Sequence, residues 1–167
     1  EKLHAHYPSL IIQFEDWSSE HAFMFLDRYK DKYPMFNDDI QGTGAVILAG
    51  LISATRLVEK ETKKSSDHRI LMVGAGSASV GVAKQLMSFF TLNGMSEEEA
   101  RLRIWTTDSK GLVTMNRGDK LPDYKQYFAR RDNGDMQLKE LSDIIDYVKP
   151  TVLLGLSTIH GLFDEKI

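Results

Sequence analysis

An α/β protein with a mostly parallel sheet and helices on both faces is the fold class that this sequence predicts. Short runs rich in apolar and β-branched residues, over residues 70–73, 104–107 and 151–156, are typical of buried strands. Stretches with helical periodicity lie between them, and strands that alternate with helices indicate a parallel sheet. A glycine turn, Gly74-Ala75-Gly76, directly follows the first run, which makes the expected fold Rossmann-like.

Three helices are expected in this part of the chain, over residues 78–93, 96–103 and 138–148. The second begins with Ser96-Glu97-Glu98-Glu99, which matches a capping box. From Ser109 to about Met136 the sequence is polar and charged, and we expect a long connection.

The N-terminal part is expected to contain one further strand and helix. Residues 9–14 are apolar and predict a buried strand. Glu15 and Asp16 stand at its carboxyl end, where α/β sheets tend to place functional groups. Ser19 is expected to cap a helix over residues 20–32.

A second helix is expected over residues 44–59, after a polar loop over residues 36–43. Its many small residues would permit close packing against a neighbouring element. Residues 60–69 are dense in charge and serine, and they are expected to form a solvated connection.

The composition excludes several classes of protein. An apolar share of 42% and a charged share of 27% are those of an ordinary globular protein. A net charge of −3 favours neither nucleic acid nor an anionic membrane as a partner, and no uninterrupted apolar run approaches the roughly 20 residues of a membrane span. The absence of cysteine excludes disulfides and thiolate metal sites.

Two acidic pairs, Glu15-Asp16 and Asp38-Asp39, flank an aromatic-rich stretch. Mg²⁺ and Mn²⁺ prefer oxygen ligands, and Glu15, Asp16 and Asp39 could supply three of them if the fold brings them together. The alternative is that these are surface acids or helix caps, since the chain has 24 acidic residues. Apolar neighbours such as Phe14 favour the metal site, because a buried carboxylate without a partner is unstable.

The glycine turn favours a dinucleotide. Its first glycine would allow the tight turn, and its second would let the backbone approach a pyrophosphate at the helix N-terminus. The third glycine of such a loop is replaced by Ser79, with Gly81 two residues later, so a purely structural turn is the alternative. Asp108, at the end of the next strand, could bond a ribose hydroxyl.

These residues resemble the malic enzyme family. F-E-D-W at 14–17, F-N-D-D-I-Q-G-T at 36–43 and G-A-G-S-A at 74–78 occur in the family's order and spacing, and the resemblance covers essentially the whole chain. It implies oxidation of malate with NAD or NADP and decarboxylation to pyruvate and CO₂, with Mg²⁺ or Mn²⁺ required. It also implies a homo-oligomeric full-length parent, located in the cytoplasm or the mitochondrial matrix.

The resemblance implies a role for each matching residue. Glu15, Asp16 and Asp39 are the expected metal ligands, and Asp38 is the acid expected to partner a catalytic lysine. The expected contacts of the cofactor follow two neighbouring strands: Gly74, Gly76, Ser77, Ala78 and Asp108.

The choice between NADP and NAD depends on the segment after Asp108. Ser109 and Lys125 fall where NADP-preferring members offer a hydroxyl and a lysine to the 2′-phosphate, and Arg117 could assist. Asp108 would repel that phosphate, which keeps NAD, or the use of both cofactors, as the alternative.

The resemblance also implies that the active site is divided. Residues 1–38 would be the edge of a preceding substrate and metal domain, and residues 39–167 an incomplete dinucleotide-binding domain. No residue matches the family's general-acid tyrosine, general-base lysine or substrate-binding arginine, so the isolated chain is expected to be incomplete. The alternative function is a non-catalytic dinucleotide-binding or assembly module. A dehydrogenase of another family would leave residues 36–43 unexplained.

Overall fold

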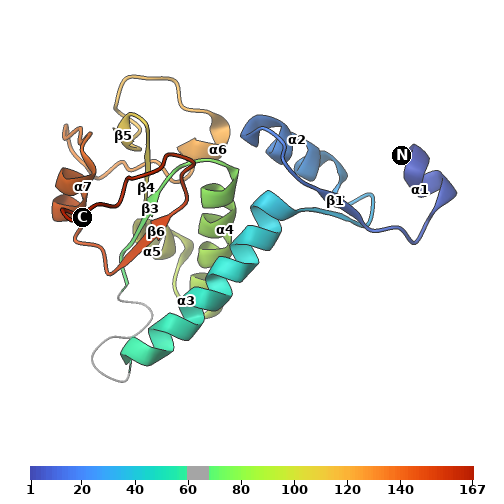
Figure 1. Ribbon diagram of the computed structural model, residues 1–167, viewed down its shortest axis with the longest axis horizontal. Helices are drawn as coiled ribbons and strands as arrows, with labels where there is room; N and C mark the ends of the chain where they lie inside the picture. Colours follow the sequence, from blue (N-terminus) through green and yellow to red (C-terminus); the bar gives the residue numbers. More distant parts are fainter. Residues whose placement is uncertain (60–67) are drawn as a thin grey trace.

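The computed structural model describes residues 1–59 and 68–167, and it confirms the α/β fold class. Within these ranges the main sheet has the strand order β5-β4-β3-β6 (Figure 1). Its strands are β3 (Ile70–Val73), β4 (Ile104–Asp108), β5 (Gly111–Leu112) and β6 (Val152–Gly155). The pairs β3–β4 and β3–β6 are parallel and β4–β5 is antiparallel, so the sheet is mostly parallel and Rossmann-like.

Helices cover both faces of this sheet. Ile70 and Met72 of β3 point into a core shared with α4 (Ser77–Leu92), against which α3 (Thr43–Glu59) packs. Leu71 lies between them in sequence and contributes to the opposite core, which contains Ile144 of α7 (Leu141–Val148). The alternation follows from the two-residue repeat of a strand, whose successive side chains point to opposite faces.

Local sequence signals predicted several elements well. The strand over residues 70–73 has the predicted bounds, and the capping box is present, with the Ser96 side chain accepting from Glu99 N and the Glu99 side chain accepting from Ser96 N. It starts α5 (Glu97–Leu102). The last predicted helix is shorter than expected, because Leu138 precedes α7 and packs beside it.

The long connection after Asp108 is more ordered than predicted. It contains β5 and α6 (Asp123–Gln126), and Val113, Leu121 and Ala129 form a small core with Ala75. These buried residues, scattered through a polar stretch, hold the connection against the glycine turn.

The stretch expected to be a solvated connection, residues 60–69, lies largely outside the described residues. His68 does not fit that expectation, because its side chain is buried and its Nδ1 lies 3.0 Å from Thr151 Oγ1.

A second, smaller parallel sheet lies in the N-terminal part, after α1 (Lys2–His6). It pairs β1 (Ile12–Phe14) with β2 (Met35–Asn37). The prediction of a buried strand over residues 9–14 is wrong in length and burial: β1 is shorter and only partly buried, since β2 is its one neighbour among the described residues.

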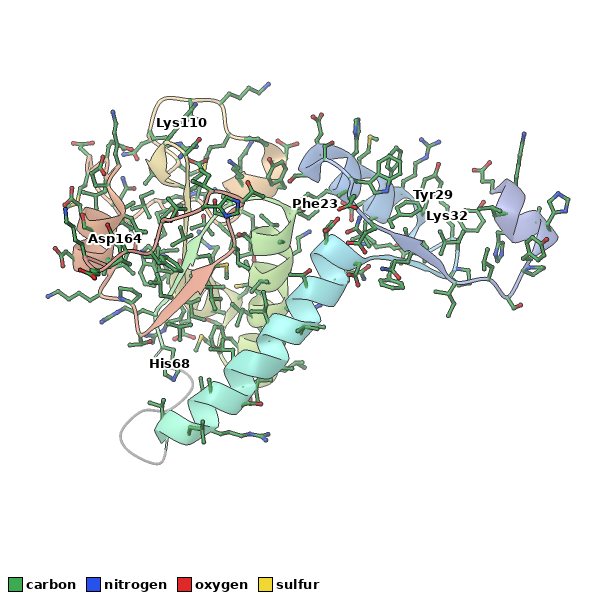
Figure 2. All side chains as sticks on the ribbon, in the orientation of Figure 1. Phe23, Tyr29, Lys32, His68, Lys110 and Asp164 are labelled. Atoms are coloured by element: carbon green, nitrogen blue, oxygen red, sulfur yellow. The ribbon has the colours of Figure 1, made fainter. Side chains whose placement is uncertain are left out.

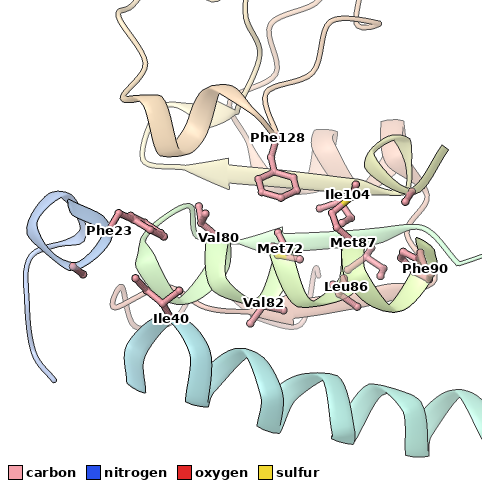
Figure 3. Packing of buried hydrophobic residues seen from close by; sticks show 14 of the residues in the cluster. Phe23, Ile40, Met72, Val80, Val82, Leu86, Met87, Phe90, Ile104 and Phe128 are labelled. Carbon is pink, nitrogen blue, oxygen red and sulfur yellow. The ribbon is translucent and has the colours of Figure 1, made fainter. Parts of the chain in front are cut away.

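The helix α2 (Ser19–Tyr29) begins earlier than predicted. Its N-cap is Ser18, so the assignment of Ser19 as the cap was wrong. Phe23 of this helix points toward α4 and is buried in the same core (Figure 3).

The predicted polar loop over residues 36–43 is instead β2 followed by a π-helical turn, η1 (Asp38–Gly42), which continues into α3. The Asn37 side chain accepts a hydrogen bond from Ile40 N (3.1 Å), and Gln41 Oε1 accepts from Asn37 N (3.0 Å). These bonds satisfy N–H groups that a helix start leaves free. The predicted domain boundary between residues 38 and 39 coincides with this turn, and the division stays a prediction.

The continuous helix Asp38–Val58 is long and apolar enough to cross a membrane, by length and composition alone. The search for uninterrupted apolar runs in the sequence did not find this helix, because polar residues such as Ser53 and Thr55 interrupt the run without breaking the helix. One helix of this kind is weak evidence for a membrane, since helices of soluble proteins pass the same test.

The start of this helix lies against the backbone of α4. A Cβ placed on Gly81 would lie 2.1 Å from the carbonyl oxygen of Ile40, and one on Gly44 would lie 3.1 Å from the carbonyl oxygen of Gly81. Figure 3 shows Ile40 between α4 and the helix that follows it. Gly81 therefore permits a close contact between helices, which explains a glycine at this position rather than at Ser79.

This contact predicts opposite effects for two glycine substitutions. Gly81→Ala should lower the free energy of unfolding by about 1–3 kcal/mol, because backbone atoms of Ile40 must move. Gly50→Ala, at an exposed α3 position with no atom within 4 Å of the added Cβ, should raise it by roughly 0.5–1 kcal/mol. Urea unfolding of both variants measures the difference, and equal effects would contradict the contact.

Candidate cofactor and metal site

Three predicted metal ligands lie together at the ends of β1 and β2. Carboxylate oxygens of Glu15, Asp16 and Asp39 all lie within 4.8 Å of one another. The parallel register that pairs Phe14 with Asn37 brings the two strand ends together; Glu15 and Asp16 follow Phe14, and Asp39 is the second residue after Asn37. Glu15 and Asp16 are exposed, and Asp39 is half-buried in η1.

The backbone at this cluster is held in an unusual conformation. Asp16 has a φ of 58°, in the left-handed region, which disfavours a non-glycine residue by roughly 1–2 kcal/mol. Its N–H donates a hydrogen bond to Asp39 Oδ2 at 3.0 Å, which ties the two segments together. Three carboxylates this close repel one another, and hard oxygen donors fit Mg²⁺ or Mn²⁺, which would remove the repulsion.

Asp38 lies beside this cluster at the start of η1 and is half-buried. Its Oδ1 would lie 2.1 Å from a Cβ placed on Gly42, so its carboxylate is folded over the turn. Its expected role as the partner of a catalytic lysine stays a prediction.

The glycine turn joins β3 to α4 through two glycines that differ in their surroundings. Gly74 has a φ of 129°, and a Cβ on it would lie 2.4 Å from the carbonyl oxygen of Leu156, at the end of β6. Gly76, the N-cap of α4, is open: the nearest heavy atom to an added Cβ would be Ser19 Oγ at 3.6 Å. Ser77 and Ala78 open the helix, whose first N–H groups have no intrahelical acceptor. The turn therefore fits an anion at the N-terminus of α4.

Ser19 contacts this turn, although the sequence indicated only a helix cap. Its Oγ accepts a hydrogen bond from Ser77 N at 3.0 Å, across 58 residues of sequence. Because α2 passes the N-terminus of α4, the hydroxyl satisfies an N–H group that we expected to face the cofactor. No local pattern marks such a contact, so sequence reasoning missed it.

Asp108 ends β4 beside the glycine turn and binds two cations. Its Oδ1 accepts from Arg117 Nη1 (2.8 Å) and Lys110 N (3.0 Å), and its Oδ2 accepts from Arg117 Nη2 (2.8 Å) and Lys125 Nζ (2.8 Å). Burial opposes ionisation, but the hydrogen bonds from Arg117 and Lys125 outweigh it and hold the pKa of Asp108 well below its ordinary range. The carboxylate is therefore charged, and two cations offset its charge.

This geometry changes the expected part of Asp108 in cofactor selectivity. Each of its oxygens already accepts two hydrogen bonds, so a ribose hydroxyl would have to replace one of them. Its expected repulsion of a 2′-phosphate is offset by Arg117 and Lys125. Ser109 is exposed in the adjoining turn, where the sequence placed it near that phosphate.

A second carboxylate, Asp119, completes the cluster and was not predicted. It accepts hydrogen bonds from Lys110 Nζ (2.8 Å) and from Arg117 Nε (2.6 Å), which lower its pKa to about 2. Three cations thus surround two carboxylates, with one net positive charge. We call Asp108, Lys110, Arg117, Asp119 and Lys125 the β4 charge cluster.

Comparisons with known proteins agree with this geometry. The family model described as malic enzyme, NAD binding domain, matches residues 40–167. The chain is 50% identical over 161 residues to an NADP-dependent malic enzyme of Dictyostelium discoideum, a match that covers 96% of this chain and 29% of that protein. It is 39% identical over 169 residues to NAD-dependent malic enzyme 3 of Bacillus subtilis, covering 96% of this chain and 29% of the relative.

Solved structures show the same fold. The crystal structure of the Entamoeba histolytica malic enzyme superposes with a TM-score of 0.68 and 28% identity, over 89% of this chain and 29% of that chain. The NAD-dependent malic enzyme of Thermotoga maritima superposes with a TM-score of 0.70 and 25% identity, over 93% of this chain and 38% of that one. This chain therefore spans only part of the length of these relatives. Matched residues, fold and relatives agree that the chain belongs to the malic enzyme family and carries its NAD-binding domain.

Proposed function

We propose that this chain supplies the dinucleotide site and the metal ligands for oxidative decarboxylation of malate to pyruvate and CO₂. The observation that supports this function most is the double link between the carboxylate cluster and the glycine turn. Ser19, three residues after Asp16, accepts a hydrogen bond from Ser77 N at the glycine turn. Ile40, next to Asp39, contacts Gly81 of α4, the helix that follows this turn. Metal and cofactor would thus be held by adjoining, mutually braced elements.

A divalent cation on Glu15, Asp16 and Asp39 would supply Lewis acidity toward the hydroxyl group of malate. The chain's own residues orient the site: Asp39 uses one oxygen to hold the Asp16 backbone, which sets the spacing of the remaining oxygens. Gly76 leaves room for a pyrophosphate, and the N-terminus of α4 provides N–H donors for it.

We propose NADP as the preferred cofactor. The net positive charge of the β4 charge cluster supports this preference, because it would attract a 2′-phosphate and gives NAD no matching advantage. The relatives named above include one NADP-dependent and two NAD-dependent enzymes, so the charge of the site carries the choice.

The proposed metal site predicts a specific loss. Asp39→Asn should weaken Mn²⁺ binding about 100-fold or more, because it removes a charged ligand while the amide oxygen can still accept from Asp16 N. Asp31→Asn, at an exposed acid outside the cluster, should leave binding unchanged. Electron paramagnetic resonance titration of Mn²⁺ measures both affinities, and equal affinities would remove Asp39 from the ligand set.

The glycine turn predicts a separation of binding from stability. Gly76→Ala should change the free energy of unfolding by less than about 0.5 kcal/mol, since its Cβ would meet only Ser19 Oγ, at an ordinary contact distance of 3.6 Å. It should weaken NADP binding about tenfold or more, the equivalent of about 1.4 kcal/mol. Gly74→Ala should instead destabilise the fold by more than about 1 kcal/mol, because of its φ of 129° and the Leu156 carbonyl. Calorimetric titration measures the NADP affinity, and urea unfolding measures the free energy of unfolding. Unaltered NADP affinity in Gly76→Ala would contradict a pyrophosphate site at Gly76.

Turnover tests the function itself. We propose that the chain alone binds Mn²⁺ and NADP without oxidising malate, because the family's tyrosine, lysine and arginine have no match in it. An N-terminally extended version should form NADPH with Mn²⁺ and malate, and Asp39→Ala should abolish this activity. Turnover by the chain alone would refute the claim that it is incomplete. Binding without turnover in the extended version would favour the alternative of a non-catalytic dinucleotide-binding module.

A further inference from the structure

Arg117 is shared between two carboxylates of the β4 charge cluster. Its Nη1 and Nη2 donate to Asp108, while its Nε and Nη2 donate to Asp119. The Arg117 side chain is only 7% exposed, so these bonds are shielded from water. Asp108 lies at the carboxyl end of β4, while Asp119 lies farther along the chain and binds the edge of the guanidinium that carries Nε.

Asp119 also holds the most exposed cation of the cluster. Lys110 Nζ donates to Asp119 at 2.8 Å, and the Lys110 side chain is 62% exposed. Figure 2 labels Lys110 in the loop at the upper edge of the view. The backbone N–H of Lys110 donates to Asp108 Oδ1, so Lys110 contacts one carboxylate through its backbone and the other through its side chain. Lys110 directly follows Ser109, and both lie in the turn at the edge where the adenosine ribose is expected.

The two carboxylates differ in what their removal would change. Without Asp119, Arg117 would keep both bonds to Asp108, so the ribose edge of the site would keep its shape. Lys110 would lose its carboxylate partner, and the net charge of the cluster would rise from one positive charge to two. A phosphate carries about −1.5 to −2 charges at pH 7, whereas a bare ribose carries none. The gain would therefore fall on the phosphorylated ribose alone.

We propose that Asp119 is a selectivity residue that limits the preference for NADP by engaging Lys110 and Arg117, the cations that a 2′-phosphate would otherwise recruit. The inference rests on the proposed function, since it places the adenosine ribose at the end of β4. It assigns the cofactor preference to the net charge of the whole cluster, in which Asp119 lowers the attraction for a 2′-phosphate and Lys125 raises it.

Calorimetric titration with 2′,5′-ADP and 5′-AMP tests this proposal, because the two probes differ only in the 2′-phosphate. Asp119→Asn should bind 2′,5′-ADP about tenfold tighter than the unmodified chain at low salt, with 5′-AMP binding unchanged. The gain should shrink at higher salt, as expected for a partly exposed charge. Asp123→Asn changes the charge equally in the nearby α6, where the carboxylate accepts from Gln126, and should alter neither probe.

Unchanged or weaker binding of 2′,5′-ADP by folded Asp119→Asn, beside normal binding by the parent chain, would overturn the role of Asp119. Should Asp119→Asn fail to fold, Lys110→Gln provides the reciprocal test. Lys110→Gln removes one positive charge that offsets the charge of Asp119, so it should weaken 2′,5′-ADP binding without changing 5′-AMP binding. If Lys110→Gln bound 2′,5′-ADP as tightly as the parent chain does, the proposal would be overturned. If the parent chain binds neither probe nor NADP, the proposed cofactor site itself is wrong, and this inference falls with it.

Discussion

The contact of Ile40 with Gly81 is the constraint on which the arrangement of the site depends. There the backbone of η1 touches the backbone of α4 with no side chain between them. Asp39 precedes Ile40, and the glycine turn lies at the N-terminus of the same α4. The distance from carboxylate cluster to glycine turn is thus set by backbone against backbone, which is far stiffer than contacts through long side chains.

A weaker contact, from Ser19 to Ser77, joins the same two regions from α2. A neutral hydroxyl satisfies the helix N-terminus without adding charge. An anionic phosphate would form stronger, charge-assisted hydrogen bonds with the same N–H groups. The structure therefore combines one rigid link, which fixes spacing, with one exchangeable link at the position where the pyrophosphate is expected.

What the sequence predicted well depended on local signals. The run Ile70–Val73 and the capping box at Ser96 are specified by neighbouring residues, and both were correct. The burial of β1 could not be predicted, because it depends on how many other strands and helices lie beside β1 in the folded chain. The π-helical turn was missed because the polar residues at 37–43 are also typical of a loop, and the sequence does not show that the Asn37 side chain accepts a hydrogen bond from Ile40 N.

The case of Asp108 shows why a charge cannot be interpreted from its own position. From the sequence, the negative charge of Asp108 was expected to repel a 2′-phosphate. The residues next to Asp108 in the sequence do not show that Arg117 and Lys125 bind its carboxylate. The two-residue turn of Ser109 and Lys110 reverses the chain into β5, which begins at Gly111 with a φ of 103°, and Arg117 returns to the end of β4. Once Arg117 and Lys125 are bound, the sign of Asp108 no longer decides the electrostatics of the site. The net charge of the cluster does, and that quantity depends equally on Asp119, which no motif marks.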